Sequence, residues 1–203
     1  MTPQLVAITG GSGSGKTWFA DRIAAALGKD AARLSLDDFY RDRSHLSLAR
    51  RKRINFDHPR AIDWPLFVAA AHGLLERRTV TVPVYDFTQS TRSTRTTRCR
   101  PRRWIIVDGL WLLAKREVRA LFAHRVFLAC PARTRLERRL ARDLLERARS
   151  AESVRTQFHG HVEPMHRRFV EPQRRHALTV IEPPVTDATV TAIVQSLRAA
   201  SPP

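Results

Sequence analysis

The chain has 203 residues, of which 43% are hydrophobic, and it carries a formal net charge of +17. This length and apolar content suit one α/β domain with its own core. No window approaches the roughly 18 consecutive apolar residues of a membrane-spanning helix, so we do not expect a membrane protein. The N-terminus lacks a basic segment followed by a cleavable apolar run, and the two cysteines have no metal or redox spacing. These features predict a cytoplasmic protein.

The basic excess comes mostly from arginine. Positive charge of this size can serve nucleic-acid binding. The arginines, however, are not interleaved with stacking aromatic residues, and no DNA- or RNA-binding module is visible. We therefore do not expect nucleic acid as a partner. Small molecules that carry several phosphates would also be bound through arginine.

The first predicted strand, residues 5–9, leads through a glycine-rich loop into a predicted helix at residues 17–27. The loop reads Gly-Gly-Ser-Gly-Ser-Gly-Lys-Thr and matches the phosphate-binding pattern G-x-x-x-x-G-K-[ST] in its required strand–loop–helix context. Glycines let backbone N–H groups turn toward a polyphosphate, and the helix N-terminus adds partial positive charge. Lys16 can reach the β- and γ-phosphates, and the Thr17 hydroxyl can hold Mg²⁺. The predicted nucleotide contacts are Gly11, Ser12, Gly13, Ser14, Gly15, Lys16 and Thr17.

The rest of the chain alternates short apolar runs with helical patterns. The further predicted strands are residues 33–36, 105–107, 126–128 and 179–181. The further predicted helices are residues 65–77, 116–123, 132–149, 153–169 and 188–199. Asp63 is expected to cap the helix that begins at Trp64-Pro65, and Asp187 to cap the last helix. This alternation predicts an α/β fold with a parallel sheet and helices on both of its faces.

One insertion interrupts the alternation. Residues 79–84 alternate between apolar and polar at period two, and residues 94–100 could form a partner strand. The pair predicts an inserted β-hairpin at about residues 79–100. We otherwise expect one domain over residues 1–203, with an arginine-rich lid at about residues 142–157.

Carboxylates follow two of the predicted strands. Asp37 and Asp38 come after the second strand, and Asp108 comes after the strand at 105–107. The carboxyl ends of parallel strands face the active crevice. A kinase needs a carboxylate against the acceptor hydroxyl, which either Asp37 or Asp38 could supply, the other being a turn or cap residue. Asp108 is placed like the Walker B carboxylate that lies near Mg²⁺.

Six motifs follow one another along the chain. They are the phosphate-binding loop, Asp37-Asp38-Phe39-Tyr40, Asn55-Phe56-Asp57-His58-Pro59, Pro83-Val84-Tyr85-Asp86-Phe87 with Arg92, Val107-Asp108-Gly109, and Arg142-Asp143 to Arg149 followed by Gln157. In these motifs and their order, from about residue 5 to about residue 184, the sequence resembles the uridine kinase family of P-loop kinases, which phosphorylates uridine and cytidine at the 5′-hydroxyl with ATP or GTP.

The resemblance implies roles for the matched positions. Asp37 would orient and deprotonate the 5′-hydroxyl, acting with Lys16, and Asp57 would bind the ribose hydroxyls. Mg²⁺ would be held by Thr17 and Asp108. The triphosphate of ATP or GTP would be contacted from the lid by Arg142, Arg147 and Arg149. The nucleoside site would also include Tyr40, Phe56, Tyr85, Ser90, Arg92, Arg139 and Gln157. The family also implies a small nucleoside substrate and a homo-oligomer.

The chain departs from the family pattern at three positions. Ser90 stands where the family has a histidine that helps to read the pyrimidine edge, and serine is too short to reach the same base atoms directly. Asp108 replaces a more frequent glutamate, and we expect Mg²⁺ binding to survive. Ala148 replaces a glycine and is expected to stiffen the lid.

Two alternatives remain open. One is a P-loop kinase for another small hydroxyl acceptor, as in phosphoribulokinase and pantothenate kinase. The Asn55–Pro59 motif argues against it, and the serine at position 90 keeps it open. The other, less favoured, is a nucleic-acid-binding P-loop ATPase, which would leave the ordered acceptor-site motifs unexplained.

Overall fold

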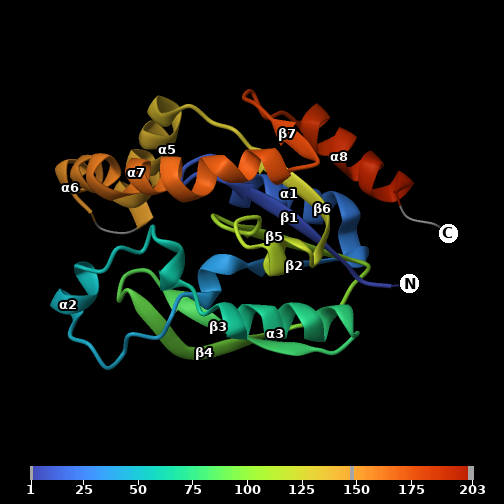
Figure 1. Ribbon diagram of the computed structural model, residues 1–203, viewed down its shortest axis with the longest axis horizontal. Coiled ribbons are helices and arrows are strands. Elements are labelled where there is room, and N and C mark those ends of the chain that lie inside the picture. Colours follow the sequence, from blue (N-terminus) through green and yellow to red (C-terminus); the bar gives the residue numbers. More distant parts are fainter. Residues whose placement is uncertain (1, 147–148, 201–203) are drawn as a thin grey trace.

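The computed structural model describes residues 2–146 and 149–200. Within these ranges a five-stranded sheet has the order β2-β5-β1-β6-β7, and each neighbouring pair of strands is parallel (Figure 1). The strands are β1 (Gln4–Gly10), β2 (Ala31–Ser35), β5 (Trp104–Gly109), β6 (Phe122–Leu128) and β7 (Thr179–Ile181). The predicted parallel sheet is confirmed. Over the same residues, no helix is both long and apolar enough to cross a membrane.

Helices cover both faces of the sheet. Alternate side chains of a strand point to opposite faces, so β1 is buried on both sides. Val6 and Ile8 pack in a core with helices α1 (Lys16–Leu27) and α8 (Asp187–Ala199). Leu5 and Ala7 belong to the second core, which includes helix α3 (Trp64–Leu75). A strand buried on both faces explains why these runs are continuously apolar.

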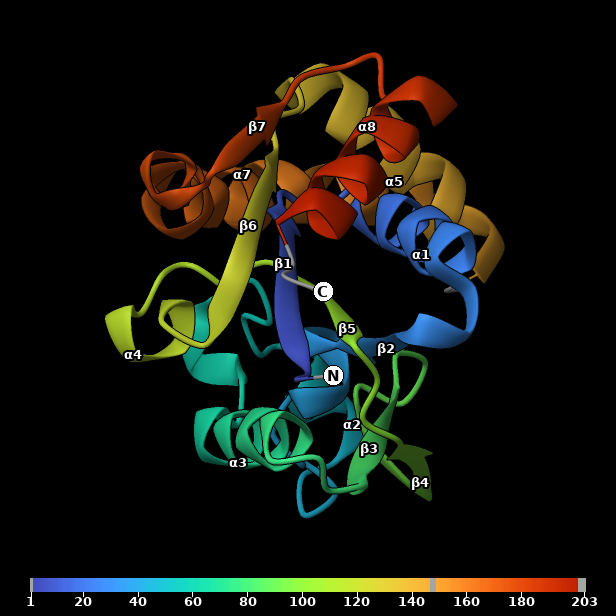
Figure 2. The same cartoon turned by 90° about the vertical axis from the view of Figure 1, so that its right-hand side faces the viewer.

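The predicted hairpin is present as a separate two-stranded antiparallel sheet. It pairs β3 (Val80–Asp86) with β4 (Thr91–Cys99). Figures 1 and 2 both place the hairpin and α3 at one end of the molecule, with α5 (Ala132–Glu146) and α7 (Glu163–Met165) at the opposite end. The remaining helices are α2 (Leu48–Lys52), α4 (Arg116–Arg119) and α6 (Ala151–Gln157).

Two predicted helices are wrong in extent. The helix expected at residues 116–123 ends at Arg119, because Phe122 starts β6, pairs with Leu5 and is buried. Sheet pairing therefore overrides the local helical pattern. The helix expected at residues 153–169 is divided by wider π-helical turns at Phe158–Val162 and His166–Val170. Pro164 lies between these turns and cannot donate a backbone N–H to the helical ladder.

One of the two predicted helix caps is correct. The Asp63 carboxylate accepts a hydrogen bond from the Leu66 backbone N–H at 3.3 Å and caps α3. The last helix is capped instead by Thr186, whose hydroxyl accepts from the Thr189 N–H at 3.4 Å. Asp187 is the first residue of α8 and forms an ion pair with Arg22.

Candidate active site

The phosphate-binding loop connects β1 to α1 and lies against α5. Gly13 and Gly15 have φ angles of 81° and 91°, which other residues rarely adopt. A Cβ atom on Gly13 would lie 2.3 Å from the carbonyl oxygen of Arg135 in α5. Arg138 of the same helix donates to the Ser14 carbonyl oxygen at 3.1 Å. The glycines therefore let the loop turn and approach α5 closely, and sequence analysis missed the contact from Arg138.

Thr17 and Asp108 meet at the start of α1, as expected of a magnesium site. The Thr17 hydroxyl donates to Asp108 Oδ2 at 2.8 Å, and Asp108 is 2% exposed at the end of β5. Its other oxygen, Oδ1, accepts from Arg33 Nη2 at 2.8 Å. Mg²⁺ prefers oxygen ligands and often binds with few protein ligands, substrate phosphates and waters. The two oxygen donors fit this requirement. Arg33 was missed because it lies 75 residues from Asp108 in the sequence.

A cavity beside the loop brings together most of the predicted site residues. The predicted residues that line it are Ser12, Lys16, Asp37, Tyr40, Phe56, Asp57, Tyr85, Ser90, Arg139, Arg142, Arg149 and Gln157. Phe87 and Leu110, to which sequence analysis gave no role, complete the lining. Phe87 is the last residue of the quoted motif that contains Tyr85, and Leu110 directly follows Asp108-Gly109; this proximity was the available signal.

Aromatic rings form one wall of this cavity. The Tyr40 and Tyr85 ring centroids are 5.0 Å apart, and the Tyr40 and Phe56 centroids are 5.7 Å apart. Tyr85 also contacts Phe87, at 5.1 Å between centroids. These contacts are edge-on or tilted, and a further planar ring can pack against such aromatic groups in the same way. The wall therefore suits a flat substrate such as a nucleobase.

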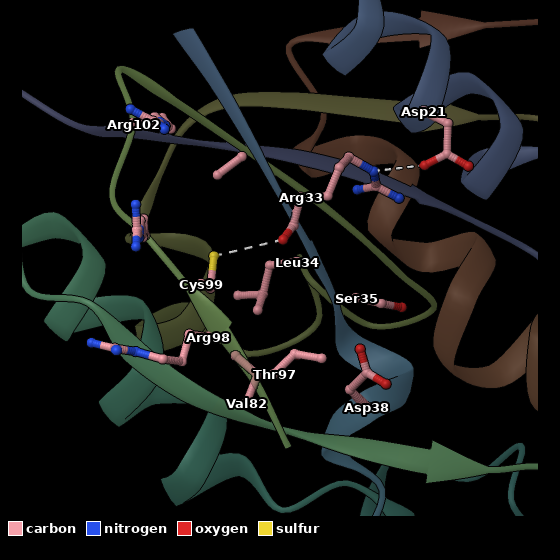
Figure 3. Close-up of a pocket in the computed structure, with 12 residues that line it drawn as sticks. Asp21, Arg33, Leu34, Ser35, Asp38, Val82, Thr97, Arg98, Cys99 and Arg102 are labelled. Carbon is pink, nitrogen blue, oxygen red and sulfur yellow. Dashed lines mark hydrogen bonds and ion pairs between the residues drawn. The ribbon is translucent and has the colours of Figure 1, made fainter. Parts of the chain in front are cut away.

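The two consecutive aspartates after β2 have different surroundings. Asp37 lines the cavity together with Lys16. Asp38 instead lines a separate cavity (Figure 3), and its Oδ1 accepts from the Tyr85 backbone N–H at 3.4 Å. Burial, aided by the nearby charges of Asp37 and Asp108, raises the pKa of Asp38 to about 6. Of these two aspartates, Asp37 is the one that lines the cavity beside the phosphate-binding loop.

Arginines surround one buried acid at the opposite wall. Asp143 of α5 is fully buried, and its carboxylate lies 2.7 Å from Arg142 Nη2 and 3.5 Å from both Arg139 Nε and Arg149 Nη1. Arg139 also donates to Ser12 Oγ at 2.7 Å and to Gln157 Oε1 at 2.8 Å. Sequence analysis assigned no role to Asp143. An acid four residues after Arg139, within an arginine run, was the available signal.

The charge around Arg139 is compensated. Burial lowers the pKa of its guanidinium from the ordinary value, while the nearby carboxylates of Asp57 and Asp143 oppose that change. Asp57, which lines the cavity, is 9% exposed, and its backbone N–H donates to Asn55 Oδ1 at 3.0 Å. The cavity beside the phosphate-binding loop therefore has carboxylates and guanidinium groups within one partly buried network.

Of the residues predicted to contact the nucleoside or to form the lid, Arg92 and Arg147 need separate description. Arg92 does not belong to the described lining of the cavity, and its Nη2 lies 3.2 Å from Oδ2 of Asp63, the residue that caps α3. Its contact with a nucleoside stays a prediction. Arg147 lies outside the described residues. The predicted lid at residues 142–157 comprises the end of α5, residues 147–148, which the structure does not describe, and α6.

Comparison with known proteins agrees with this geometry. Residues 5–190 match the phosphoribulokinase / uridine kinase family. The chain is 40% identical over 199 residues to a protein named uridine kinase from Lactobacillus johnsonii, covering 97% of this chain and 94% of that protein. It is 39% identical over 180 residues to one of the same name from Deinococcus deserti, covering 88% and 87%. The fold resembles phosphoribulokinase from Rhodobacter spheroides, with a TM-score of 0.66, 15% identity, and coverage of 93% and 73%.

Proposed function

The chain belongs to the phosphoribulokinase / uridine kinase family, and on that premise we propose that it transfers the γ-phosphoryl group of ATP to the 5′-hydroxyl of uridine or cytidine. The observation that carries this proposal is the acceptor cavity. It joins Lys16 of the phosphate-binding loop to the Asp37 carboxylate and to an aromatic wall. The relatives named uridine kinase support a nucleoside as the acceptor.

Each group in the cavity has a part in this reaction. Asp37 orients the 5′-hydroxyl and accepts its proton as the oxygen attacks phosphorus. Asp57 offers two acceptor oxygens to the vicinal ribose hydroxyls. The rings of Tyr40 and Tyr85 pack against the base. Lys16 and the loop N–H groups hold the β- and γ-phosphates and stabilise the charge of the transferring group.

Mg²⁺ would be held by Thr17 Oγ1 and the Asp108 carboxylate and would neutralise part of the phosphate charge. Arg33 Nη2 holds Asp108 Oδ1 at 2.8 Å, which leaves Asp108 Oδ2 directed toward Thr17. Arg142 and Arg149 lie at the other side of the cavity, where closure over the phosphates would exclude water and suppress ATP hydrolysis. GTP could serve as donor in place of ATP.

The test is an ADP-release assay with Mg²⁺–ATP against a panel of acceptors. Uridine, cytidine, adenosine, ribulose 5-phosphate and pantothenate represent the nucleoside and non-nucleoside alternatives. We expect turnover on uridine or cytidine, and loss of that turnover in Lys16→Ala. Activity on ribulose 5-phosphate or pantothenate, with none on either pyrimidine nucleoside, would overturn the proposal and assign the protein to the other acceptor class.

The assay also reports on base choice. Ser90 lines the cavity at the hairpin turn with a φ angle of 52°. A serine there cannot span the distance that a histidine covers, so we expect weak discrimination between uridine and cytidine. Ser90→His should change the ratio of kcat/KM for the two nucleosides. A role in pyrimidine salvage, a cytoplasmic location and a homo-oligomeric state accompany this proposal as predictions, the last open to light scattering.

A further inference from the structure

A second cavity lies between strand β2 and the β3–β4 hairpin (Figure 3). Its volume is about 430 Å³, within the range of small-molecule binding sites. Among the described residues it shares no lining side chain with the acceptor cavity. The Cys99 thiol donates to the Arg33 carbonyl oxygen at 3.7 Å and connects the two walls. Of its lining residues, the reaction proposed above uses Arg33 alone, through the contact with Asp108.

Positive charge gathers at one side of the cavity. Its lining contains the arginines at positions 33, 98, 100 and 102, together with Asp21 and Asp38. Figure 3 shows Arg98 and Arg102 on the side opposite Asp21 and Asp38. The 91–107 segment, which supplies three of the arginines, contains no acidic residue. The arginine side of the cavity therefore favours an anionic ligand.

The arginines differ in how much of their charge is already compensated. Arg33 lies 2.8 Å from a carboxylate oxygen of Asp21 and 2.8 Å from one of Asp108. In contrast, Arg98, Arg100 and Arg102 form no ion pair with any residue in the ranges 2–146 and 149–200. Guanidinium groups bind phosphate oxygens through paired, charge-assisted hydrogen bonds. These three side chains are the ones available to a phosphate.

The combined charge of the three arginines suggests more than one phosphate. Arg98 lies in β4, and positions 100 and 102 follow the end of that strand at Cys99. Their three positive charges exceed the charge of about −1.5 to −2 that one phosphate group carries at neutral pH. Leu34 and Val82 lie between the arginine side and the acidic side in Figure 3. Both side chains belong to the buried core and form the apolar base of the cavity.

We propose that the cavity between β2 and the hairpin is a second binding site, specific for a small molecule with linked phosphates, held by Arg98, Arg100 and Arg102. The shared chemistry is an oligophosphate, which occurs free or attached to a nucleoside. Nucleic acid would instead require a track of contacts along an exposed surface. The site is separate from the acceptor cavity, so the proposal stands independently of which acceptor is phosphorylated.

The test is calorimetric titration without Mg²⁺ in a Lys16→Ala background, which weakens the phosphate-binding loop as a competing site. Sodium tripolyphosphate and ATP are the probes, and the difference between them measures the contribution of a base and sugar. We expect the Lys16→Ala protein to bind tripolyphosphate. Adding Arg98→Ser, Arg100→Ser and Arg102→Ser should weaken binding by at least roughly tenfold, since three charge-assisted contacts are removed.

A matched variant controls for net charge. Arg116, Arg168 and Arg175 are exposed and form no ion pair within the described part of the chain. Changing all three to serine should leave tripolyphosphate affinity within about twofold of the background value. With Lys16 intact, the Arg98, Arg100 and Arg102 triple variant should keep its thermal unfolding temperature and its turnover. Equal weakening in both triple variants, no weakening in either, or binding of a single-stranded oligonucleotide in place of tripolyphosphate would overturn the proposal.

Discussion

The phosphate-binding loop and the arginine-rich helix α5 face the same site but are built in different ways. The loop depends on its backbone, with Gly13 and Gly15 at positive φ and close packing against α5. The arginines of α5 depend on side-chain charge, because Arg139, Arg142 and the nearby Arg149 all approach the single buried carboxylate of Asp143. The conformation of the loop is specified by residues that are neighbours in the sequence. The arginine cluster depends on one buried acid, and loss of that acid would remove a counter-charge from buried guanidinium groups.

The largest effect is expected at the carboxylate that faces the loop across the cavity. Asp37→Asn removes the proton acceptor but keeps the shape, so we expect kcat to fall by about 10³-fold, while the Kd for Mg²⁺–ATP stays within about twofold. Steady-state kinetics with nucleotide titration would check this. The neighbouring Asp38→Asn is the matched control, because Asp38 lines the other cavity. An equal loss of kcat in both variants would refute the assignment of Asp37.

The arginine cluster around Asp143 should be destabilised when that acid is removed. Asp143→Ala leaves Arg139 in a buried position without one of its counter-charges, and we expect a loss of about 3 kcal/mol in unfolding free energy. Denaturant unfolding measures this loss. Glu137→Gln is the control on the same helix, since Glu137 pairs with Arg133 at the exposed surface, 3.0 Å apart. That change should cost less than about 0.5 kcal/mol, and a similar loss in both variants would contradict the central role of Asp143.

The phosphate-binding loop should lose its conformation when one of its glycines is replaced. Gly13→Ala adds a methyl group 2.3 Å from the Arg135 carbonyl oxygen at a φ of 81°, so we expect a loss of about 2–3 kcal/mol in unfolding free energy and much weaker ATP binding. Gly28→Ala is the control that introduces backbone strain without a steric clash, because Gly28 has a φ of 60° and no atom within 4 Å of an added Cβ. Its ψ of −132° lies outside the left-handed helical region, so the change should cost about 1–3 kcal/mol but leave ATP affinity unchanged. Unchanged ATP affinity in Gly13→Ala would show that the close packing is dispensable.

The smallest predicted effect concerns Asp38 and depends on pH. Its folded-state pKa of about 6 lies above the ordinary value of 3.8, so the folded protein binds a proton more tightly than the unfolded chain. The contribution of the Asp38 side chain to the free energy of unfolding is fully present at low pH, and it is lost as the pH rises through about 6. Asp38→Asn should therefore raise the free energy of unfolding by about 1 kcal/mol at pH 7.5. This figure is smaller than the full pKa shift would give, because solvent screens a partly exposed carboxylate. At pH 4 the two proteins should be equally stable, and a less stable variant at pH 7.5 would contradict this.

Features that depend on short sequence segments could be predicted. The phosphate-binding loop, the hairpin and the five strand positions follow from glycine spacing, period-two alternation and apolar runs. The motif residues Asp37, Tyr40, Asp57 and Tyr85 were expected in one site, and the fold brings them to one cavity. Their chemical roles remain predictions until the variants are measured.

Features that depend on distant pairing could not be predicted. Arg33 meets Asp108 only because β2 lies beside β5, and Arg92 of the hairpin pairs with Asp63 at the start of α3. Phe122 follows a helical pattern but joins β6 because β1 offers a partner strand. In each case a contact between residues far apart in the sequence decides the outcome, and one sequence carries no record of that contact.

The most direct test of the central claim is the identity of the phosphorylated product. The protein is incubated with uridine and Mg²⁺–ATP, and the product is examined by proton-coupled ³¹P NMR. Transfer to the 5′-hydroxyl places phosphorus beside a CH₂ group, so the account predicts a triplet from a nucleoside 5′-monophosphate. A doublet, from transfer to a ring hydroxyl, or the absence of any nucleoside phosphate while ATP is consumed, would contradict it.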